Sequence, residues 1–298
     1  MKIVLKSPAK VNLFLEIKNK SKDGYHNLES IMQTISLYDE LFFEDIDKNI
    51  ILSCDNKALP CDKTNLVYKA ALAIKTHFNI NRGVKIYFKK NIPQGAGLGG
   101  GSSNAATTIL ALVKLWNIKT TQKELESIAT KLGADVPFFL TGGTCLCEGI
   151  GELVTPLKSI TNLNMILVNP GFGVSTAEVY KKINFPLTNP VKIHKIRHLI
   201  SSSSFNNKEA FKSCFNRLEE FVFRDFTAIL KIKTLLNKLC CVSLMSGSGA
   251  TVFGILSTNS SKKYIISELK KYSWDFCFTS ATNLSVKDQL KNIDSGIV

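Results

Sequence analysis

The sequence predicts a fold that mixes strands and helices, of the α+β or α/β class. Apolar residues alternate with polar ones from Ala9 to Ile17, which is the two-residue period of a strand with one buried face. Residues 102–116 and 121–133 instead have the wider apolar spacing of helices, and the apolar run MILVNP at 165–170 is typical of a buried strand. Strands and helices therefore alternate along the chain.

The first predicted strand has one fully apolar face. The opposite face carries Lys10 and Asn12, which are therefore neighbours. Beyond the turn signal Asp23-Gly24, the runs SIMQTISLY at 30–38 and ELFFEDI at 40–46 predict two further strands. The apolar face of the first strand consists of Ala9, Val11, Leu13, Leu15 and Ile17.

The next part of the chain, residues 64 to 133, predicts three helices and one strand. Residues 64–78 have helical spacing, and GVKIYFKK at 83–90 predicts a strand. We expect Ser102 to cap the helix at 102–116 and Thr120 or Thr121 to cap the one that follows. That last helix should end at Gly133.

The later half of the chain repeats this mixture. We place a soft domain boundary near residues 155–162, because the buried-strand run at 165–170 restarts the pattern there. Residues 185–207 are rich in Ser, Asn and Lys and predict long loops. VSLMSGSGATVFGIL at 242–256 predicts two strands around a Gly/Ser turn, followed by a helix at 260–271 and the strand WDFCFTSA at 274–281.

Composition excludes several classes of protein. Of the 298 residues 45% are apolar, which is typical of a globular chain and argues against disorder. Lys6 and Lys10 interrupt the N-terminal MKIVLKSPAK, so no signal-peptide core forms, and we expect a cytoplasmic protein without membrane segments. The eight cysteines include no CxxC pair and predict neither a disulfide framework nor a zinc site.

The net charge of +14 raises the question of a nucleic-acid partner. Lysines are spread along the chain, and the forked phosphate and base contacts typical of nucleic-acid binding favour arginine. We therefore favour a compositional origin of the charge and expect no specific nucleic-acid partner. Of the 38 basic residues only four are arginine, Arg82, Arg197, Arg217 and Arg224.

The stretch NIPQGAGLGGGSSNAATTIL at 91–110 is the strongest functional signal. It places five glycines between Gln94 and Gly101, and nothing from Asn91 to Val113 carries a charge. Glycines let backbone N–H groups crowd around an anion, and a helix that begins at Ser102 or Ser103 adds its unpaired N–H groups. The stretch lacks the lysine of a Walker loop and the later acidic residue of a dinucleotide fingerprint. We interpret it as a phosphate-binding loop of another type.

The loop spacing PxxxGLGGGSS resembles the ATP loop of the GHMP kinases. SPAKVNLFLEI at 7–17, DGYHNLESIMQ at 23–33, LGADVPFF at 132–139 and SGSGATVFG at 246–254 are similar to further motifs of this family, in the family's order. The DGYH segment at 23–26 resembles the corresponding motif of the subfamily that phosphorylates 4-diphosphocytidyl-2-C-methyl-D-erythritol. The resemblance covers residues 1 to about 180 and 240 to 285, and it is weak across 186–235.

This resemblance implies an α+β fold of two domains. Residues 1–157 would form an ATP-binding domain of the type shared with a ribosomal protein, and residues 158–298 a ferredoxin-like domain. The reaction would move the γ-phosphoryl group of ATP to the 2-hydroxyl of the cytidine diphosphate sugar alcohol, in the non-mevalonate isoprenoid pathway. Asp135 would be the general base, and Lys10 would hold it ionised and neutralise phosphoryl charge.

The resemblance also implies two binding sets. ATP, expected with Mg²⁺, would contact Pro93, Gly95, Gly97, Gly99, Gly100, Gly101, Ser102, Ser103, Asn65, Leu66 and Lys90. The cytidyl substrate would contact Asn12, Tyr25, His26, Tyr180, Gly247, Ser248 and Gly249, with the base held between the two tyrosine rings. The resemblance nominates no carboxylate as a Mg²⁺ ligand, and it leaves Ser102 or Ser103 as the candidate.

Ordinary structural roles compete with these assignments. Asp135 precedes Val136-Pro137 and is a good helix cap, Lys10 is one of many lysines, and Tyr25 and His26 are each more often structural. Asn65 as a helix cap, Leu66 as a core residue and Lys90 as a surface residue are explained nearly as well as they are by contacts with ATP. His194 and His198 lie one helical turn apart, yet without a third ligand we favour surface histidines over a metal site.

Two other functions remain open at this point. Another GHMP kinase, acting on mevalonate, homoserine or a sugar, would share the glycine loop but lack the DGYH segment. A basic RNA-binding protein would share the ribosomal type of fold and the charge. We expect a monomer or a homodimer, and the sequence does not decide between them.

Overall fold

The computed structural model describes residues 1–21, 23–160, 162–183, 192–202 and 208–294. Its first sheet is built on a long antiparallel hairpin of β1 (Lys2–Lys20) and β2 (His26–Ile46). The alternation from Ala9 to Ile17 lies inside β1, as predicted. The two strands predicted at 30–38 and 40–46 form one continuous strand, because Asp39 continues the pairing opposite Ser7 instead of breaking it.

Further strands extend this sheet on both sides of the hairpin. On one edge β4 (Gly83–Lys89) pairs antiparallel with β2, and β3 (Ile50–Cys54) pairs parallel with β4. The first half of β2 pairs with β5 (Thr144–Gly149), which carries β6 (Leu153–Pro156). On the other edge the short β8 (Phe215–Asn216) pairs parallel with β1.

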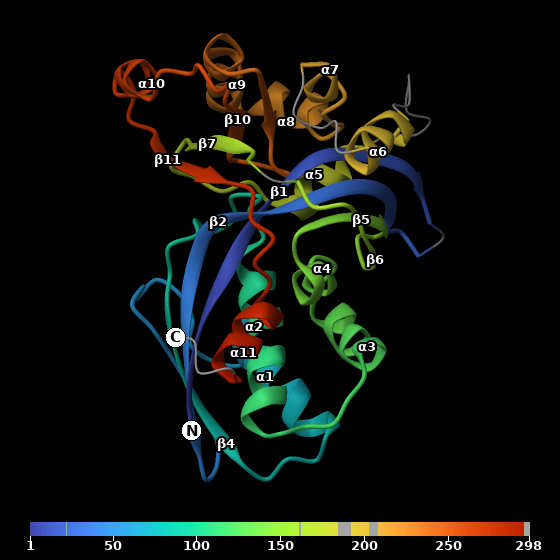
Figure 1. Ribbon diagram of the computed structural model, residues 1–298, viewed down its shortest axis with the longest axis vertical. Helices are drawn as coiled ribbons and strands as arrows, with labels where there is room; N and C mark the ends of the chain where they lie inside the picture. Colours follow the sequence, from blue (N-terminus) through green and yellow to red (C-terminus); the bar gives the residue numbers. More distant parts are fainter. Residues whose placement is uncertain (22, 161, 184–191, 203–207, 295–298) are drawn as a thin grey trace.

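Helices cover one face of the first sheet (Figure 1). They are α1 (Leu66–His77), α2 (Gly100–Leu115), α3 (Gln122–Leu132), α4 (Val136–Thr141) and the last helix, α11 (Val286–Asp294). Together with the sheet they bury one apolar core. Gln289 of α11 is hydrogen bonded to both backbone groups of Lys6, at 2.8 Å each, as a neighbouring strand would be. The last helix therefore completes the layer begun by the first.

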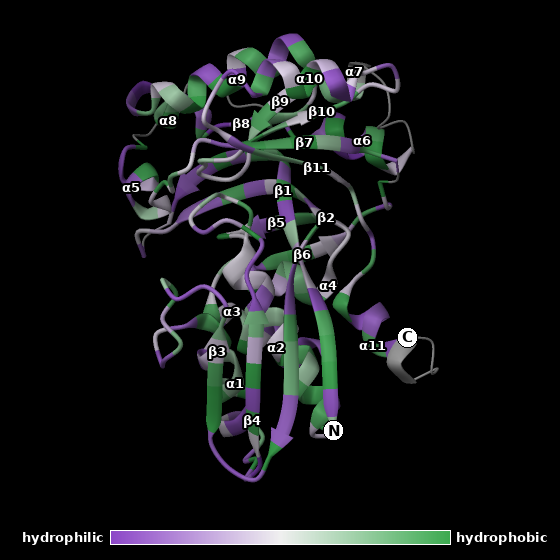
Figure 2. Cartoon of the chain, turned by 90° about the vertical axis from the view of Figure 1, so that its left-hand side faces the viewer, coloured by the Kyte–Doolittle hydropathy of each residue, from purple (hydrophilic) through white to green (hydrophobic). Residues whose placement is uncertain are grey.

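The second sheet has four antiparallel strands in the order β11-β7-β10-β9. These are β7 (Asn164–Asn169), β9 (Val242–Met245), β10 (Val252–Ile255) and β11 (Asp275–Ser280). The remaining helices are α5 (Thr176–Lys181), α6 (His194–Ser201), α7 (Lys208–Phe211), α8 (Glu219–Asp225), α9 (Thr227–Leu239) and α10 (Lys262–Leu269). Helices α8, α9 and α10 lie over the outer side of this sheet (Figure 2).

Strand β7 is buried on both faces, which explains its uninterrupted apolar run. Ile166 and Val168 belong to the core formed with α9 and α10. Met165 and Leu167 belong to a different core, which includes Ala9, Val11 and Leu13 of the predicted apolar face of β1. The other two residues of that face, Leu15 and Ile17, belong to the core formed with α9 and α10. The two sheets are therefore joined by a shared apolar layer between β1 and β7.

Apart from the merged strand β2, most predicted elements lie close to their predicted positions, and a second correction concerns the start of α2. This helix begins at Gly100 with Gly99 as its N-cap, so the predicted cap at Ser102 is wrong. Gly99 has a φ of 70°, a left-handed conformation that a serine adopts only under strain. In contrast, Thr121 and Gly133 flank α3 as expected.

The predicted boundary near 155–162 lies where the chain leaves one sheet and enters the other. Strand β6 ends at Pro156 and β7 begins at Asn164, but β8 and α11, from the later half, complete the first sheet and its helices. The division into 1–157 and 158–298 stays a prediction. Within the predicted loop region at 185–207, α6 forms a helix, whereas 184–191 and 203–207 lie outside the described residues. Among the described helices, none is both long and apolar enough to span a membrane.

Candidate active site

A cavity of about 1070 Å³ lies where β1, the glycine-rich loop, the α3–α4 turn and α5 meet. It brings together nearly all of the predicted site residues, although they are far apart in the sequence. Those lining it are Lys10, Asn12, Tyr25, His26, Asn65, Leu66, Lys90, Pro93, Gly95, Gly97, Gly99, Gly100, Gly101, Ser102, Asp135, Tyr180, Gly247 and Ser248. Ser103 and Gly249 do not line it: the Ser103 hydroxyl is hydrogen bonded to that of Ser7 at 2.7 Å, and Gly249 packs against Met245.

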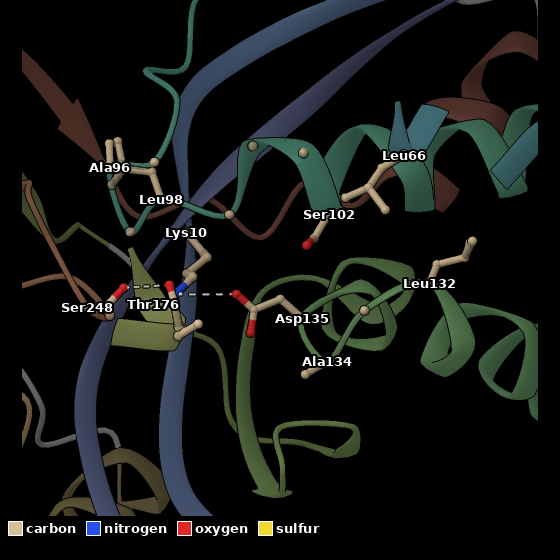
Figure 3. Close-up of a pocket in the computed structure, with 18 of the residues that line it drawn as sticks. Lys10, Leu66, Ala96, Leu98, Ser102, Leu132, Ala134, Asp135, Thr176 and Ser248 are labelled. Atoms are coloured by element: carbon tan, nitrogen blue, oxygen red, sulfur yellow. Dashed lines mark hydrogen bonds and ion pairs between the residues drawn. The ribbon is translucent and has the colours of Figure 1, made fainter. Parts of the chain in front are cut away.

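Lys10 and Asp135 form an ion pair at the centre of this cavity (Figure 3). The Lys10 Nζ lies 3.6 Å from Asp135 Oδ2, and the lysine side chain is 4% exposed while the aspartate side chain is 31% exposed. Lys10 also donates to Asn12 Oδ1 at 2.6 Å, and Asn12 in turn donates to Ser30 Oγ at 2.8 Å. The ammonium group is thereby fixed on β1, whereas the carboxylate remains open to solvent.

Asp135 occupies the N-cap position of α4, but its side chain does not cap the helix. Its carboxylate accepts no hydrogen bond from the first turn, and its backbone already has helical angles, with φ −82° and ψ −10°. The interpretation of this side chain as a cap is therefore wrong. Its carboxylate is turned toward Lys10 instead.

The charge lining the cavity is strongly positive. Asp135 is the one carboxylate among the described lining residues, and five lysines line the same cavity, Lys10, Lys20, Lys90, Lys131 and Lys181. A cavity with low-dielectric walls and an excess of one charge attracts ligands of the opposite charge. This lining suits ligands that carry several phosphate groups.

Three glycines of the loop leave no room for a side chain, Gly97, Gly99 and Gly100, and a Cβ at Gly100 would lie 2.9 Å from Ile92 Cγ2. A Cβ at Gly97 would lie 1.9 Å from the Ser246 carbonyl oxygen, and one at Gly99 would lie 2.8 Å from the Phe139 ring. At Gly101, by contrast, a Cβ would meet only Leu66, at 3.5 Å. The loop is thus pressed against the 246–249 turn on one side, and the N–H groups that begin α2 are exposed to the cavity on the other.

Asp39 anchors the loop from behind, and the sequence analysis did not identify it. The carboxylate is fully buried and accepts hydrogen bonds from the N–H groups of Asn91 and Ile92, from Asn104 Nδ2 at 2.9 Å and from Lys90 Nζ at 2.6 Å. Lys90 is therefore not a surface lysine; its burial lowers its pKa, and the Asp39 charge opposes that shift. An acidic residue between two apolar strand runs was the available signal, but Glu40 beside it made it look like part of a polar break.

Asn65 and Leu66 line the cavity beside the loop. Asn65 also caps α1, because its Oδ1 accepts from the Val67 N–H at 2.9 Å. Its cap role is confirmed, and it does not exclude a contact with a ligand.

Tyr25, His26 and Tyr180 line another part of the cavity. The His26 and Tyr180 rings lie 5.2 Å apart at 50° to one another. Tyr25 is 62% exposed, so its interpretation as a core residue is wrong. Burial and the charge of Lys20 lower the pKa of His26, which favours the neutral ring. A neutral histidine both donates and accepts hydrogen bonds, as recognition of a polar ring edge requires.

The described part of the chain contains no group of three or more His, Cys, Asp or Glu side chains that could hold a metal ion. His194 and His198 are exposed on α6, as surface histidines would be. Asp135 is the one carboxylate among the described lining residues that could contact a hard cation, and the Ser102 hydroxyl at the start of α2 is one of several neutral oxygen donors there.

Comparisons with known proteins agree with this geometry. Residues 65–143 match the model of the GHMP kinases N terminal domain. The 4-diphosphocytidyl-2-C-methyl-D-erythritol kinase of Clostridium botulinum is 43% identical over 84% of this chain and 89% of its own length, and that of Clostridium beijerinckii is 42% identical over 92% and 98%.

Solved structures are similar over nearly the whole chain. A crystal structure of 4-(cytidine 5'-diphospho)-2C-methyl-D-erythritol kinase has a TM-score of 0.78 at 30% identity and covers 94% of this chain and 100% of its own. The homoserine kinase from Cytophaga hutchinsonii has a TM-score of 0.75 at 17% identity over 96% of both chains, which shows the shared fold alone. The chain therefore belongs to the 4-diphosphocytidyl-2-C-methyl-D-erythritol kinase family of the GHMP kinases.

Proposed function

We propose that this chain transfers the γ-phosphoryl group of ATP to the 2-hydroxyl of 4-diphosphocytidyl-2-C-methyl-D-erythritol, in the non-mevalonate isoprenoid pathway. The observation that carries the proposal is the position of the Lys10–Asp135 pair, which lines the same cavity as the beginning of α2 and the His26–Tyr180 rings. Phosphoryl transfer needs an aligned hydroxyl, a proton acceptor and neutralisation of the moving charge. The cavity offers a candidate for each.

Asp135 is proposed to accept the proton of the attacking hydroxyl. Its carboxylate is accessible and takes no part in capping α4, so its oxygens are available to a substrate. Lys10 would keep that carboxylate ionised and stabilise the charge that develops on the phosphoryl oxygens. Because Asn12 fixes the ammonium group, Lys10 needs no rearrangement during the reaction.

The loop from Pro93 to Ser102 is proposed to hold the phosphates of ATP through the N–H groups that begin α2. Asn65, Leu66 and Lys90 line the cavity beside it and would contact the nucleoside. Mg²⁺ fits a site where phosphate oxygens supply most of the ligands, with Ser102 and Asp135 as oxygen donors of the chain. The cation would neutralise charge on the nucleotide phosphates.

His26, Tyr25 and Tyr180 are proposed to bind the cytosine. The neutral His26 ring would hydrogen bond the polar edge of the base, while the aromatic rings would contact its faces. A site built to hydrogen bond one edge rejects a base with a different donor pattern, because its buried polar groups are then left unpaired.

A parallel assay with radiolabelled ATP tests the proposal. The purified protein is given the cytidyl substrate, mevalonate, homoserine or galactose in separate reactions, and label transfer is measured. We expect transfer to the cytidyl alcohol alone. Transfer to another acceptor without transfer to the cytidyl alcohol would refute the substrate assignment.

A further inference from the structure

We propose that Asn216 is a positioning residue for phosphoryl transfer, and that it acts by aiming the backbone N–H of Ser248 into the active-site cavity. This inference rests on the proposed function and extends it to the segment 215–220. Asn216 is 2% exposed and does not line the cavity, so it would act through the 245–249 turn.

The side chain of Asn216 holds two carbonyl groups of that turn. Its Nδ2 donates to the Met245 oxygen at 2.7 Å and to the Gly247 oxygen at 2.8 Å. Its Oδ1 accepts from the Leu218 N–H at 2.9 Å. The orientation of the amide is determined by these partners, because two carbonyl oxygens require the donor end and an N–H requires the acceptor end.

Because the peptide group is planar, fixing the direction of a carbonyl group also fixes the direction of the N–H that follows it. In a trans peptide the C=O and the N–H point in opposite directions. The Met245–Ser246 peptide shows this arrangement, since its oxygen accepts from Asn216 while its N–H donates to the Thr251 oxygen at 2.9 Å. In the Gly247–Ser248 peptide the oxygen likewise faces Asn216, so its N–H is directed away from Asn216.

The Ser248 N–H is available to a ligand. Within the described residues no protein group accepts it, and Ser248 itself lines the cavity. The Ser248 hydroxyl is held by Thr176 at 2.7 Å. An N–H that no protein group accepts, in a cavity with an excess of lysines, is suited to an anionic oxygen.

The turn also lies against Lys10. A Cβ at Gly247 would be 3.4 Å from Lys10 Nζ and 3.4 Å from the Gly97 oxygen, so the backbone of the turn lies close to both the ammonium group and the glycine loop. The Ser248 N–H and the Lys10 ammonium therefore approach the same region. Donors fixed before the reaction stabilise charge that develops on a transferred phosphoryl group.

The segment that carries Asn216 is itself firmly held. Arg217 binds both oxygens of the buried Glu16 on β1, at 2.8 and 2.7 Å. Glu219 accepts from the Met245 N–H at 2.7 Å, which braces the start of the same turn. Asn216 is thus a fixed anchor between β1 and the turn.

The test compares Asn216→Asp with Val222→Ala. Asn216→Asp keeps the size of the side chain but replaces the donor that holds both carbonyl groups with an oxygen. Val222 is buried in the core behind the same segment and has no polar atom, so Val222→Ala removes packing without touching the turn's hydrogen bonds. The kcat, both KM values and the Tm are measured with whichever acceptor the wild-type protein phosphorylates.

Removal of one transition-state donor costs on the order of 10²–10³ in kcat, and we expect about 10–10² here because Asn216 acts indirectly. KM for ATP should change less than about three-fold. Val222→Ala should lower the Tm and leave kcat unchanged. If Asn216→Asp does not fold, Asn216→Ser replaces it. Serine is too short to donate to both the Met245 and Gly247 oxygens and adds no charge, so the same fall in kcat is expected.

Two results would overturn the inference: a kcat within two-fold of the wild type in Asn216→Asp, or an equal loss of kcat in Val222→Ala. A wild-type protein that phosphorylates a different alcohol would refute the proposed substrate, while the comparison of variants would still decide the role of Asn216. In the wild type, the backbone ¹⁵N–¹H signal of Ser248 should also shift when ATP analogue and acceptor are added. In Asn216→Asp that shift should be reduced.

Discussion

Replacing Asp135 with asparagine separates catalysis from stability. The variant keeps the shape of the side chain and an oxygen that can face Lys10, but it removes the proton acceptor. Loss of a general base costs about 10²–10⁴ in rate, so kcat should fall by that factor. The KM for ATP should change little, because the proposed role of Asp135 is in the transition state.

The expected stability loss follows from the ion pair. At 3.6 Å the attraction between unit charges is about 1 kcal/mol at the dielectric constant of water and about 5 kcal/mol at an effective value of ~20. Because 31% of the Asp135 side chain is exposed, solvent screening keeps the loss near the lower figure. Since the carboxylate caps nothing, no capping energy is added. The Tm should therefore fall by only a few degrees.

The assay measures ADP release at saturating ATP and cytidyl alcohol, beside thermal unfolding. Thr121→Ala is the matched control, because Thr121 does cap a helix, accepting from the Glu124 N–H. It should lose about 1 kcal/mol of stability and keep its kcat. If Asp135→Asn instead turned over normally and melted much earlier than the control, Asp135 would be a structural residue and the proposed mechanism would be wrong.

Four further outcomes are expected. Tyr25→Ala and His26→Ala should each raise KM for the cytidyl substrate about ten-fold or more with little change in KM for ATP, measured by steady-state kinetics. Burial and Lys20 lower the pKa of His26, so KM for the cytidyl substrate should stay constant as the pH falls to 6.5, the ordinary pKa of histidine, and should rise below the lowered pKa. Lys20→Met removes a positive charge near His26, so its pKa and the rise in KM should move to higher pH. If the NMR titration of His26 is the same in Lys20→Met as in the wild type, this reasoning is wrong. Gly97→Ala should abolish ATP binding in calorimetry, because its Cβ would lie 1.9 Å from the Ser246 oxygen. Nonspecific binding to DNA or RNA should be no tighter than a Kd of ~10⁻⁵ M at physiological salt, and tight binding by anisotropy would revive the RNA-binding alternative.

Elements with a clear apolar period could be predicted from the sequence, and elements that depend on distant partners could not. Strand β1 shows its period because one face meets the second sheet. The long β2 was predicted in two pieces because Asp39 looked like an interruption, and only its four distant donors explain a buried carboxylate there. Helix α9 was missed although Ile229, Ile232 and Leu236 have helical spacing, because the surrounding segment carries no family motif.

The site shows the same division. The glycine loop could be recognised because a phosphate-binding backbone needs a local run of glycines. That Gly97 and Gly99 are required by Ser246 and Phe139 could not be foreseen, since those contacts cross long stretches of sequence. Nothing local in the sequence indicates the two hydrogen bonds from Asn216 to the turn after β9.

The return of α11 to the first sheet has a consequence for synthesis in the cell. Val286 and Leu290 are buried in the core that β1, α2 and α4 begin to form, yet they are synthesised after all the described strands of both sheets. The nascent chain therefore exposes an apolar surface beside β1 until α11 has been synthesised. A product terminated before residue 285 would keep that surface exposed and lose the two bonds between Gln289 and Lys6. Chaperones and proteases recognise such surfaces, so chains that contain α11 would accumulate while chains that lack it are removed.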